Sequence, residues 1–213
     1  MKPILRRTLS SIAVGSALAV AAFTATATAA PPAATATAAP PAATATAVST
    51  TQAQSAQITR EQVIAAQNAW GDALVAISTT HDKSGLEAAT KKAEKVIDSA
   101  YGYSLGPVLF KPTLTVAPQT FRTTREGALA YFVGGNPKFA NDTGFALKSW
   151  RSYQVENAAI FTDGDVAISM GNVRLTDKDG KVTVVDKTWG WKRGTDGNLR
   201  IVLHHSSLPY NPG

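Results

Sequence analysis

The stretch Leu199-Arg-Ile-Val-Leu-His-His-Ser-Ser-Leu-Pro-Tyr210 decides the fold, because its apolar run indicates the last β-strand of the domain. It also contains two of the three histidines in the chain, His204 and His205. Imidazole is the side chain whose ordinary pKa, about 6.5, lets it exchange a proton near neutral pH. The segment therefore supplies the first candidates for acid–base chemistry.

Neighbouring residues on a strand point to opposite faces of the sheet, so the two histidines are predicted to face apart. His205 shares its face with the more apolar row, which is Leu199, Ile201 and Leu203. We expect that row to face the helices, with His205 as a cavity acid/base or ligand-binding group and His204 on an outer, dimeric face. The alternative is a half-buried strand histidine held by a backbone or hydroxyl partner.

Three more extended runs precede this strand, and short turns join them all. The predicted strands are 150–162, 165–176, 182–193 and 198–207, and their connections contain Asp163-Gly164, Asp177-Lys-Asp-Gly180 and Gly194-Thr-Asp-Gly197. Asp-Gly pairs accept the positive φ values that tight hairpins need. The pattern predicts an antiparallel meander.

Helical signals lie upstream of these strands. Thr59-Arg-Glu-Gln62 has the spacing of a capping box, and apolar residues at helical spacing follow it. A break at His81–Gly85 separates this helix from a second one that ends near Gly102. A short strand at Val108–Lys111 and a third helix, capped by Thr123-Thr-Arg-Glu126, follow. Helices followed by a meander predict an α+β domain.

Two segments carry a family resemblance. Ala158-Ala-Ile-Phe-Thr-Asp-Gly-Asp-Val-Ala-Ile-Ser-Met-Gly171 and the closing His-His-Ser-Ser resemble the nuclear transport factor 2-like superfamily, and within it the bacterial SnoaL-like and calmodulin-dependent-kinase association-domain-like branch. The resemblance implies a cone-shaped cavity between the helices and a curved sheet, and dimerisation through the sheet. It implies no single activity, because this fold hosts lyases, isomerases, dehydratases and binding modules.

Bacterial chains that combine Phe121–Gly135 with the histidine ending sometimes carry the label phosphoribosyl-AMP cyclohydrolase. Enzymes of that name use cysteine ligands for zinc and a clustered Asp motif for magnesium. This chain has no cysteine and no Asp-x-Asp-x-Asp cluster, so its sequence does not support the label.

Asp186 is the carboxylate that we expect to work with His205, since it lies mid-strand and cross-strand neighbours approach within a few ångströms. A surface salt bridge of Asp186 is the alternative. Tyr101, Trp150 and Asn172 are candidates, together with His205, to line a ligand cavity. No metal site and no cofactor are expected, because adjacent strand histidines diverge and the chain has no cysteine or His-x-His pair.

The N-terminus is predicted to be an export signal. Residues 1–29 combine Lys2, Arg6 and Arg7 with a short apolar stretch, and residues 30–56 form an Ala/Pro/Thr-rich linker with a nine-residue repeat. We expect a periplasmic or secreted protein with one domain at 57–213 and no membrane span after cleavage. In that domain 18 basic and 15 acidic residues leave a net charge of +3 without a basic stripe, which argues against nucleic-acid binding.

These observations favour an exported, homodimeric small-molecule-binding domain with an aromatic cavity and an unknown ligand. A cofactor-free enzyme performing dehydration or isomerisation, with His205 as general acid/base and Asp186 as its partner, is the second hypothesis. A structural association domain is the third.

Overall fold

The computed structural model describes residues 57–212, and the predicted signal peptide and linker lie outside them. The chain forms a long helix α2 (Arg60–Ala100), a short strand β1 (Leu109–Lys111) and a second helix α3 (Arg125–Val133). Two 3₁₀ turns, η1 (Pro137–Phe139) and η2 (Phe145–Leu147), lead into four strands. These are β2 (Trp150–Asp163), β3 (Val166–Asp177), β4 (Val182–Arg193) and β5 (Leu199–Ser207), so the predicted α+β meander is confirmed.

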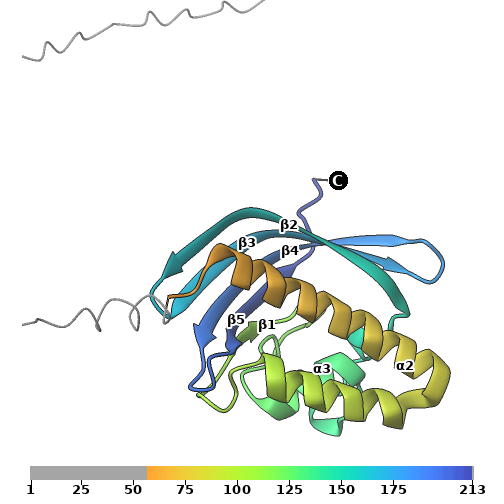
Figure 1. Ribbon diagram of the computed structural model, residues 1–213. Coiled ribbons are helices and arrows are strands. Elements are labelled where there is room, and N and C mark those ends of the chain that lie inside the picture. The colour runs from red at the N-terminus through yellow and green to blue at the C-terminus, as the bar shows by residue number, and fades with distance from the viewer. Residues whose placement is uncertain (1–56, 213) are drawn as a thin grey trace, which may run out of the picture. The chain divides into compact units, whose positions relative to one another are not determined.

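The sheet has the order β1-β5-β4-β3-β2, with antiparallel pairs from β2 to β5. The pairing that the sequence did not predict is that of β1, which runs parallel to β5 and places Phe110 beside His204. Figure 1 shows α2 crossing one face of the sheet, with α3 next to the second half of α2. Helices and sheet together enclose the cone-shaped interior expected from the superfamily resemblance.

Helix α2 begins at the predicted capping box, in which Thr59 accepts from the backbone of Gln62 and the Gln62 side chain accepts from the backbone of Thr59. The predicted break is a kink at Gly85, whose φ of 80° is a left-handed conformation that glycine adopts without strain. The cap of α3 is Thr124, one residue after the predicted Thr123, because the Thr124 hydroxyl accepts from the backbone of Gly127.

The core is mainly aromatic between α2 and the sheet. Trp70 of α2 meets Trp189 edge to face at 5.6 Å between ring centroids, and Trp191 follows on the same strand. An ion pair between Arg122 and Asp142 is also buried, with two hydrogen bonds of 2.8 and 2.7 Å. This ion pair joins the segment that leads into α3 to the segment between η1 and η2. Among residues 57–212, no helix is both long and apolar enough to cross a membrane.

Candidate active site in the sheet–helix cavity

The structure reverses the predicted orientation of the two histidines. His204 is 1% exposed and points into the interior, whereas His205 is exposed on the outer face. The reason is a β-bulge in β5: Gly190 pairs with Leu203 and Trp191 pairs with Ile201, which leaves Val202 without a partner. The extra residue shifts the alternation by one position, so Ile201 and His204 both face inward. The prediction that His205 lines the cavity is therefore wrong.

His204 lies in an aromatic cage. Its ring stacks on Phe110 at 4.5 Å between centroids and meets Trp70 edge to face at 5.5 Å. Its Nδ1 is 2.9 Å from the Tyr101 hydroxyl, which accepts a hydrogen bond of 3.0 Å from Trp70 Nε1. Burial lowers the pKa of His204 well below its usual value, and the nearby charge of Lys187 lowers it further. The imidazole is neutral at pH 7.

Lys187 is the second ionisable group of this interior, because the inward row of β4 includes Val185, Lys187 and Trp189. Its Nζ lies 2.7 Å from His204 Nε2 and 4.6 Å from the centroid of the Trp70 ring. Burial removes water from the ammonium group and so lowers the pKa of Lys187 to about 7. Its amine and ammonium forms are thus both populated near neutral pH.

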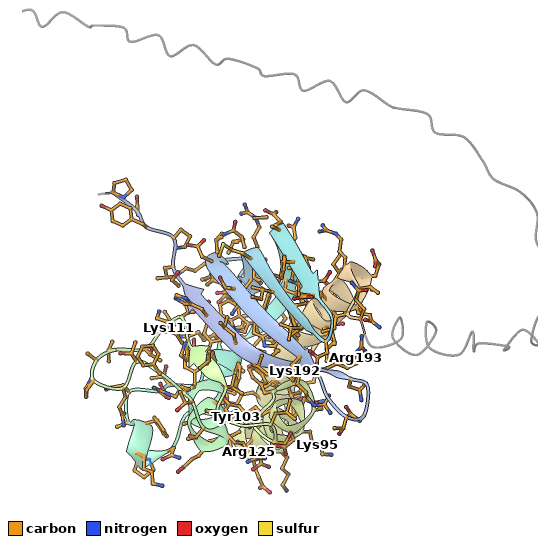
Figure 2. All side chains as sticks on the ribbon, turned by 90° about the vertical axis from the view of Figure 1, so that its left-hand side faces the viewer. Lys95, Tyr103, Lys111, Arg125, Lys192 and Arg193 are labelled. Atoms are coloured by element: carbon orange, nitrogen blue, oxygen red, sulfur yellow. The ribbon has the colours of Figure 1, made fainter. Side chains whose placement is uncertain are left out.

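Hydroxyl groups lie along the same wall. Thr113 and Ser206 share a hydrogen bond of 2.6 Å between their oxygens, and the Tyr131 hydroxyl accepts from the backbone of Leu114 at 3.4 Å. Lys111, labelled beside β5 in Figure 2, donates to the backbone oxygen of Ser206 at 3.0 Å and so ties β1 to the end of β5. Burial raises the pKa of the Tyr131 hydroxyl, which therefore stays protonated.

We call the five side chains that face this cavity the buried polar cluster: Thr113, Tyr131, Lys187, His204 and Ser206. The remaining walls are apolar and include three phenylalanine rings, those of Phe110, Phe132 and Phe145. About 170 Å³ is empty between the side chains, but no part of it is wide enough for a water molecule. A substrate can enter only when side chains at the wall move.

A second hollow of about 340 Å³ adjoins this cavity, since both are lined by Thr113 and Phe145. Lys148 and Lys181 lie at its wall with Asp177, so its mouth is cationic overall. We call this hollow the vestibule.

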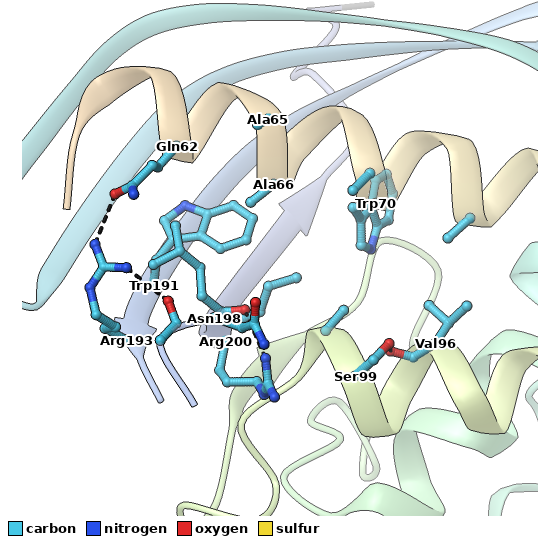
Figure 3. A pocket seen from close by; sticks show the side chains of 16 residues that line it. Gln62, Ala65, Ala66, Trp70, Val96, Ser99, Trp191, Arg193, Asn198 and Arg200 are labelled. Atoms are coloured by element: carbon cyan, nitrogen blue, oxygen red, sulfur yellow. Dashed lines mark hydrogen bonds between the residues drawn. The ribbon is translucent and has the colours of Figure 1, made fainter. Parts of the chain in front are cut away.

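A larger groove of about 610 Å³ lies elsewhere, between the start of α2 and the ends of β4 and β5 (Figure 3). Its wall is mainly alanine and other apolar residues. The ionisable side chains that line it, Arg193 and Arg200, do not release a proton at physiological pH. Arg193 is also hydrogen-bonded to Gln62 at 2.8 Å. The groove therefore lacks acid–base groups, and the smaller cavity is the better candidate for chemistry.

The other predicted site residues divide between the two faces. Tyr101 is buried and holds His204, and Trp150 is buried at the wall of the vestibule, where its Nε1 donates to Phe145 at 2.8 Å. Asp186 and Asn172 face outward and hydrogen-bond to each other at 2.7 Å. The prediction that Asp186 works with a cavity histidine is wrong, because Val185 and Lys187 occupy the inward positions on either side of it.

Sequence reasoning thus missed most of the buried polar cluster as site residues. For Lys187 a signal existed, because it alternates with Val185, Trp189 and Trp191, all apolar side chains that would face a core. For Thr113 none existed: it is 93 residues from Ser206 in the chain and meets it only through the parallel β1–β5 pairing. Within residues 57–212, no group of three or more His, Cys, Asp or Glu side chains is arranged to hold a metal ion.

This arrangement suits acid–base chemistry on a small substrate. Neutral hydroxyls donate hydrogen bonds to oxygen atoms, an amine with a pKa near 7 takes or gives a proton, and aromatic walls exclude bulk water. Fold and site together define an α+β protein in which helices pack on one face of a five-stranded sheet and a polar cavity lies in the interior.

Comparison with known proteins names the family. The family model for metal-independent carbonic anhydrase matches residues 61–208, and the chain belongs to this family. A curated relative from Nostoc sp. strain PCC 7120, called metal-independent carbonic anhydrase, is 63% identical over 153 residues, which are 72% of this chain and 75% of the relative.

Two solved structures extend the comparison. The crystal structure of the iota-carbonic anhydrase from a cyanobacterium, complexed with bicarbonate, is 62% identical with a TM-score of 0.72 and covers 73% of this chain and 94% of that one. A structure assigned to the calcium/calmodulin dependent protein kinase II association domain of Xanthomonas campestris is 24% identical with a TM-score of 0.48, over 71% of this chain and 89% of that one. The second likeness is too distant to carry an argument about function.

These findings overturn the predicted function. The first hypothesis was a binding domain with an unknown ligand. The family is instead one of carbonic anhydrases, and the Nostoc relative and the cyanobacterial crystal structure both carry that name. The superfamily resemblance was right at the level of the fold but pointed to no activity, because it did not name this family.

Proposed function

We propose that this protein catalyses the reversible hydration of CO₂ to bicarbonate and a proton, and that the reaction takes place at the buried polar cluster. The observation that carries the proposal is the bicarbonate complex of a cyanobacterial carbonic anhydrase that is 62% identical and is covered over 94% of its length. The cluster supplies what the two reactants require, an apolar wall for CO₂ and hydrogen-bond donors for bicarbonate.

The hydroxyls of Thr113, Ser206 and Tyr131 are the donors in this proposal. As water adds to the carbon of CO₂, negative charge develops on the CO₂ oxygens, and donors fixed in place stabilise that charge without rearranging. Thr113 and Ser206 now bond to each other at 2.6 Å, so each has a hydroxyl to redirect toward an oxygen of the substrate. The phenylalanine walls hold CO₂ and keep other water away from it.

Substrate entry is proposed to run through the vestibule. Thr113 and Phe145 separate the vestibule from the cavity, and rotation of these two side chains would join the two spaces. Lys148 and Lys181 at the vestibule wall favour the approach of the bicarbonate anion.

The test is CO₂ hydration by the purified protein, followed by stopped-flow with a pH indicator. We expect Ser206→Ala and Thr113→Val to lower kcat/KM about 10- to 100-fold, because each removes one donor to the developing charge. Ser207→Ala is the matched control, since Ser207 is next in the chain and lies opposite outward-facing Asp186. The proposal would be refuted if the unmodified protein hydrated CO₂ no faster than buffer alone does.

We also propose that the chain is exported and forms a homodimer. The first 29 residues support export, and the exposed outer sheet face supports a dimer, since Phe161, Ile168 and Met170 are 63, 45 and 58% exposed there. Native mass spectrometry of chain recovered from a periplasmic or secreted fraction tests both proposals. A monomer that retains residues 1–29 would contradict them.

A further inference from the structure

Lys187 is a buried cation or amine that no carboxylate balances. Its side chain is 3% exposed, and none of the ion pairs among residues 57–212 includes it. The buried carboxylate of Asp142 is already paired with Arg122. Burying an unpaired charge is costly, so a site that keeps a lysine here needs it to be neutral or to meet an anion.

We propose that Lys187 takes the proton released when water adds to CO₂ and that the resulting ammonium is the counter-charge of bicarbonate. This inference rests on the proposed function and assigns the one role in the reaction that the hydroxyls cannot fill. A carboxylate would repel the anionic product, whereas an amine that becomes an ammonium attracts it.

A water oxygen forms a bond to the carbon of CO₂ while one O–H bond of that water breaks, and its proton moves to the lone pair of Lys187 Nζ. One C–O double bond becomes a single bond whose oxygen carries the negative charge of bicarbonate. After bicarbonate leaves, the ammonium gives its proton to a buffer base, which restores the neutral amine.

The other ionisable groups in and around the cavity do not fill this role. His204 from β5 is neutral, and both its burial and Lys187 lower its pKa, so it holds an added proton poorly. Burial raises the pKa of Tyr101 at the end of α2 and of Tyr131 on α3, so both hydroxyls remain protonated. Lys111 is directed to the backbone oxygen of Ser206. Lys187, whose pKa of about 7 suits exchange at neutral pH, is the remaining base of the cavity.

His204 acts as a positioning residue in this arrangement. In the tautomer that this role requires, Lys187 Nζ donates to His204 Nε2 over 2.7 Å, and the amine lone pair is then directed away from the imidazole ring. Its Nδ1 then carries the hydrogen and donates to the Tyr101 oxygen over 2.9 Å. Uptake of a proton by Nζ keeps both hydrogen bonds, so the step needs no rearrangement of the buried aromatic cage.

Two substitutions separate charge from proton exchange. Lys187→Met keeps the length of the side chain without the amine, and Lys187→Arg keeps a positive charge that does not ionise at accessible pH. We expect both to lower kcat for CO₂ hydration at least 100-fold. Lys192→Met is the control, because Lys192 lies on the same strand, is 45% exposed and pairs with Asp165 at the surface. We expect its kcat to stay within twofold of that of the unmodified protein.

The pH dependence and an NMR titration complete the test. For the unmodified protein, kcat for hydration should rise through about pH 7 and level above pH 8, and sodium bicarbonate should raise the NMR-measured pKa of Lys187 by at least one unit. The titration uses the intact protein, with the Lys187 signal assigned by its absence from Lys187→Arg. An active protein whose Lys187→Met variant keeps kcat within threefold and keeps the same pH profile overturns the role of Lys187, as does a bicarbonate-insensitive Lys187. An inactive unmodified protein refutes instead the proposed function.

Discussion

Replacing Tyr101 by phenylalanine isolates the hydrogen bonds that hold His204 in place. The change removes only the hydroxyl, which lies 3.0 Å from Trp70 Nε1 and 2.9 Å from His204 Nδ1. Both partners are buried, so each loses a hydrogen bond that water does not replace. An unsatisfied buried polar group costs about 1–3 kcal/mol, and two of them give an expected loss of about 2–6 kcal/mol in the free energy of unfolding.

The assay is urea unfolding, with heat unfolding as a second measure. For a domain of this size, a loss of about 2–6 kcal/mol corresponds to a fall of about 5–20 °C in Tm. Because His204 holds Nζ of Lys187, we also expect kcat for CO₂ hydration to fall about tenfold with KM little changed. Tyr210→Phe is the control, since Tyr210 is 89% exposed. A Tyr101→Phe protein within 0.5 kcal/mol of the unmodified one would refute the reasoning.

Four further predictions concern other parts of the molecule. Asp142→Asn leaves Arg122 charged in a buried site, so urea unfolding should show a loss of about 3–5 kcal/mol, and a loss below 1 kcal/mol would contradict this. Between pH 7 and 10 the unfolded chain holds the Lys187 proton and the folded chain does not. The free energy of unfolding should therefore rise with pH by up to about 1.4 kcal/mol per pH unit. Urea titrations at each pH should show that Lys187→Met removes this rise. His205→Gln should keep kcat within twofold, because His205 faces outward; a large loss would place it in the reaction after all. Dialysis against a chelator, with the metal content checked by mass spectrometry, should leave the rate of CO₂ hydration unchanged, because the family is described as metal-independent. A loss of activity that only an added metal restores would contradict this.

Local chemistry made much of the fold predictable. The Thr59–Gln62 capping box and the Gly85 kink specify where helices begin and bend, and both act through residues close in the chain. The Asp-Gly turns likewise determined the hairpins, so the predicted strand 182–193 matches β4 residue for residue. Such features need no knowledge of distant partners.

The site was harder to predict, because its members come from four separate parts of the chain. Thr113 follows β1, Tyr131 lies on α3, Lys187 lies on β4 and His204 on β5, and only the closed fold brings them to one cavity. Lys187 was within reach of sequence reasoning, since strand alternation puts it in a row with Val185 and Trp189. Imidazole is the usual proton carrier near neutral pH, but burial lowers the pKa of both groups and makes the lysine the better carrier in the folded protein.

The sequence by itself thus determined the order of helices and strands, the hairpin turns and the presence of two adjacent histidines on the last strand. Only the tertiary structure decided which histidine faces the interior. That choice depends on one unpaired residue, Val202, where β5 bulges against β4 and the end of α2 bonds to Ile201 through the backbone of Gly102 at 2.9 Å. A bulge is set by packing between strands and helix, and one extra residue exchanges the two faces of everything after it.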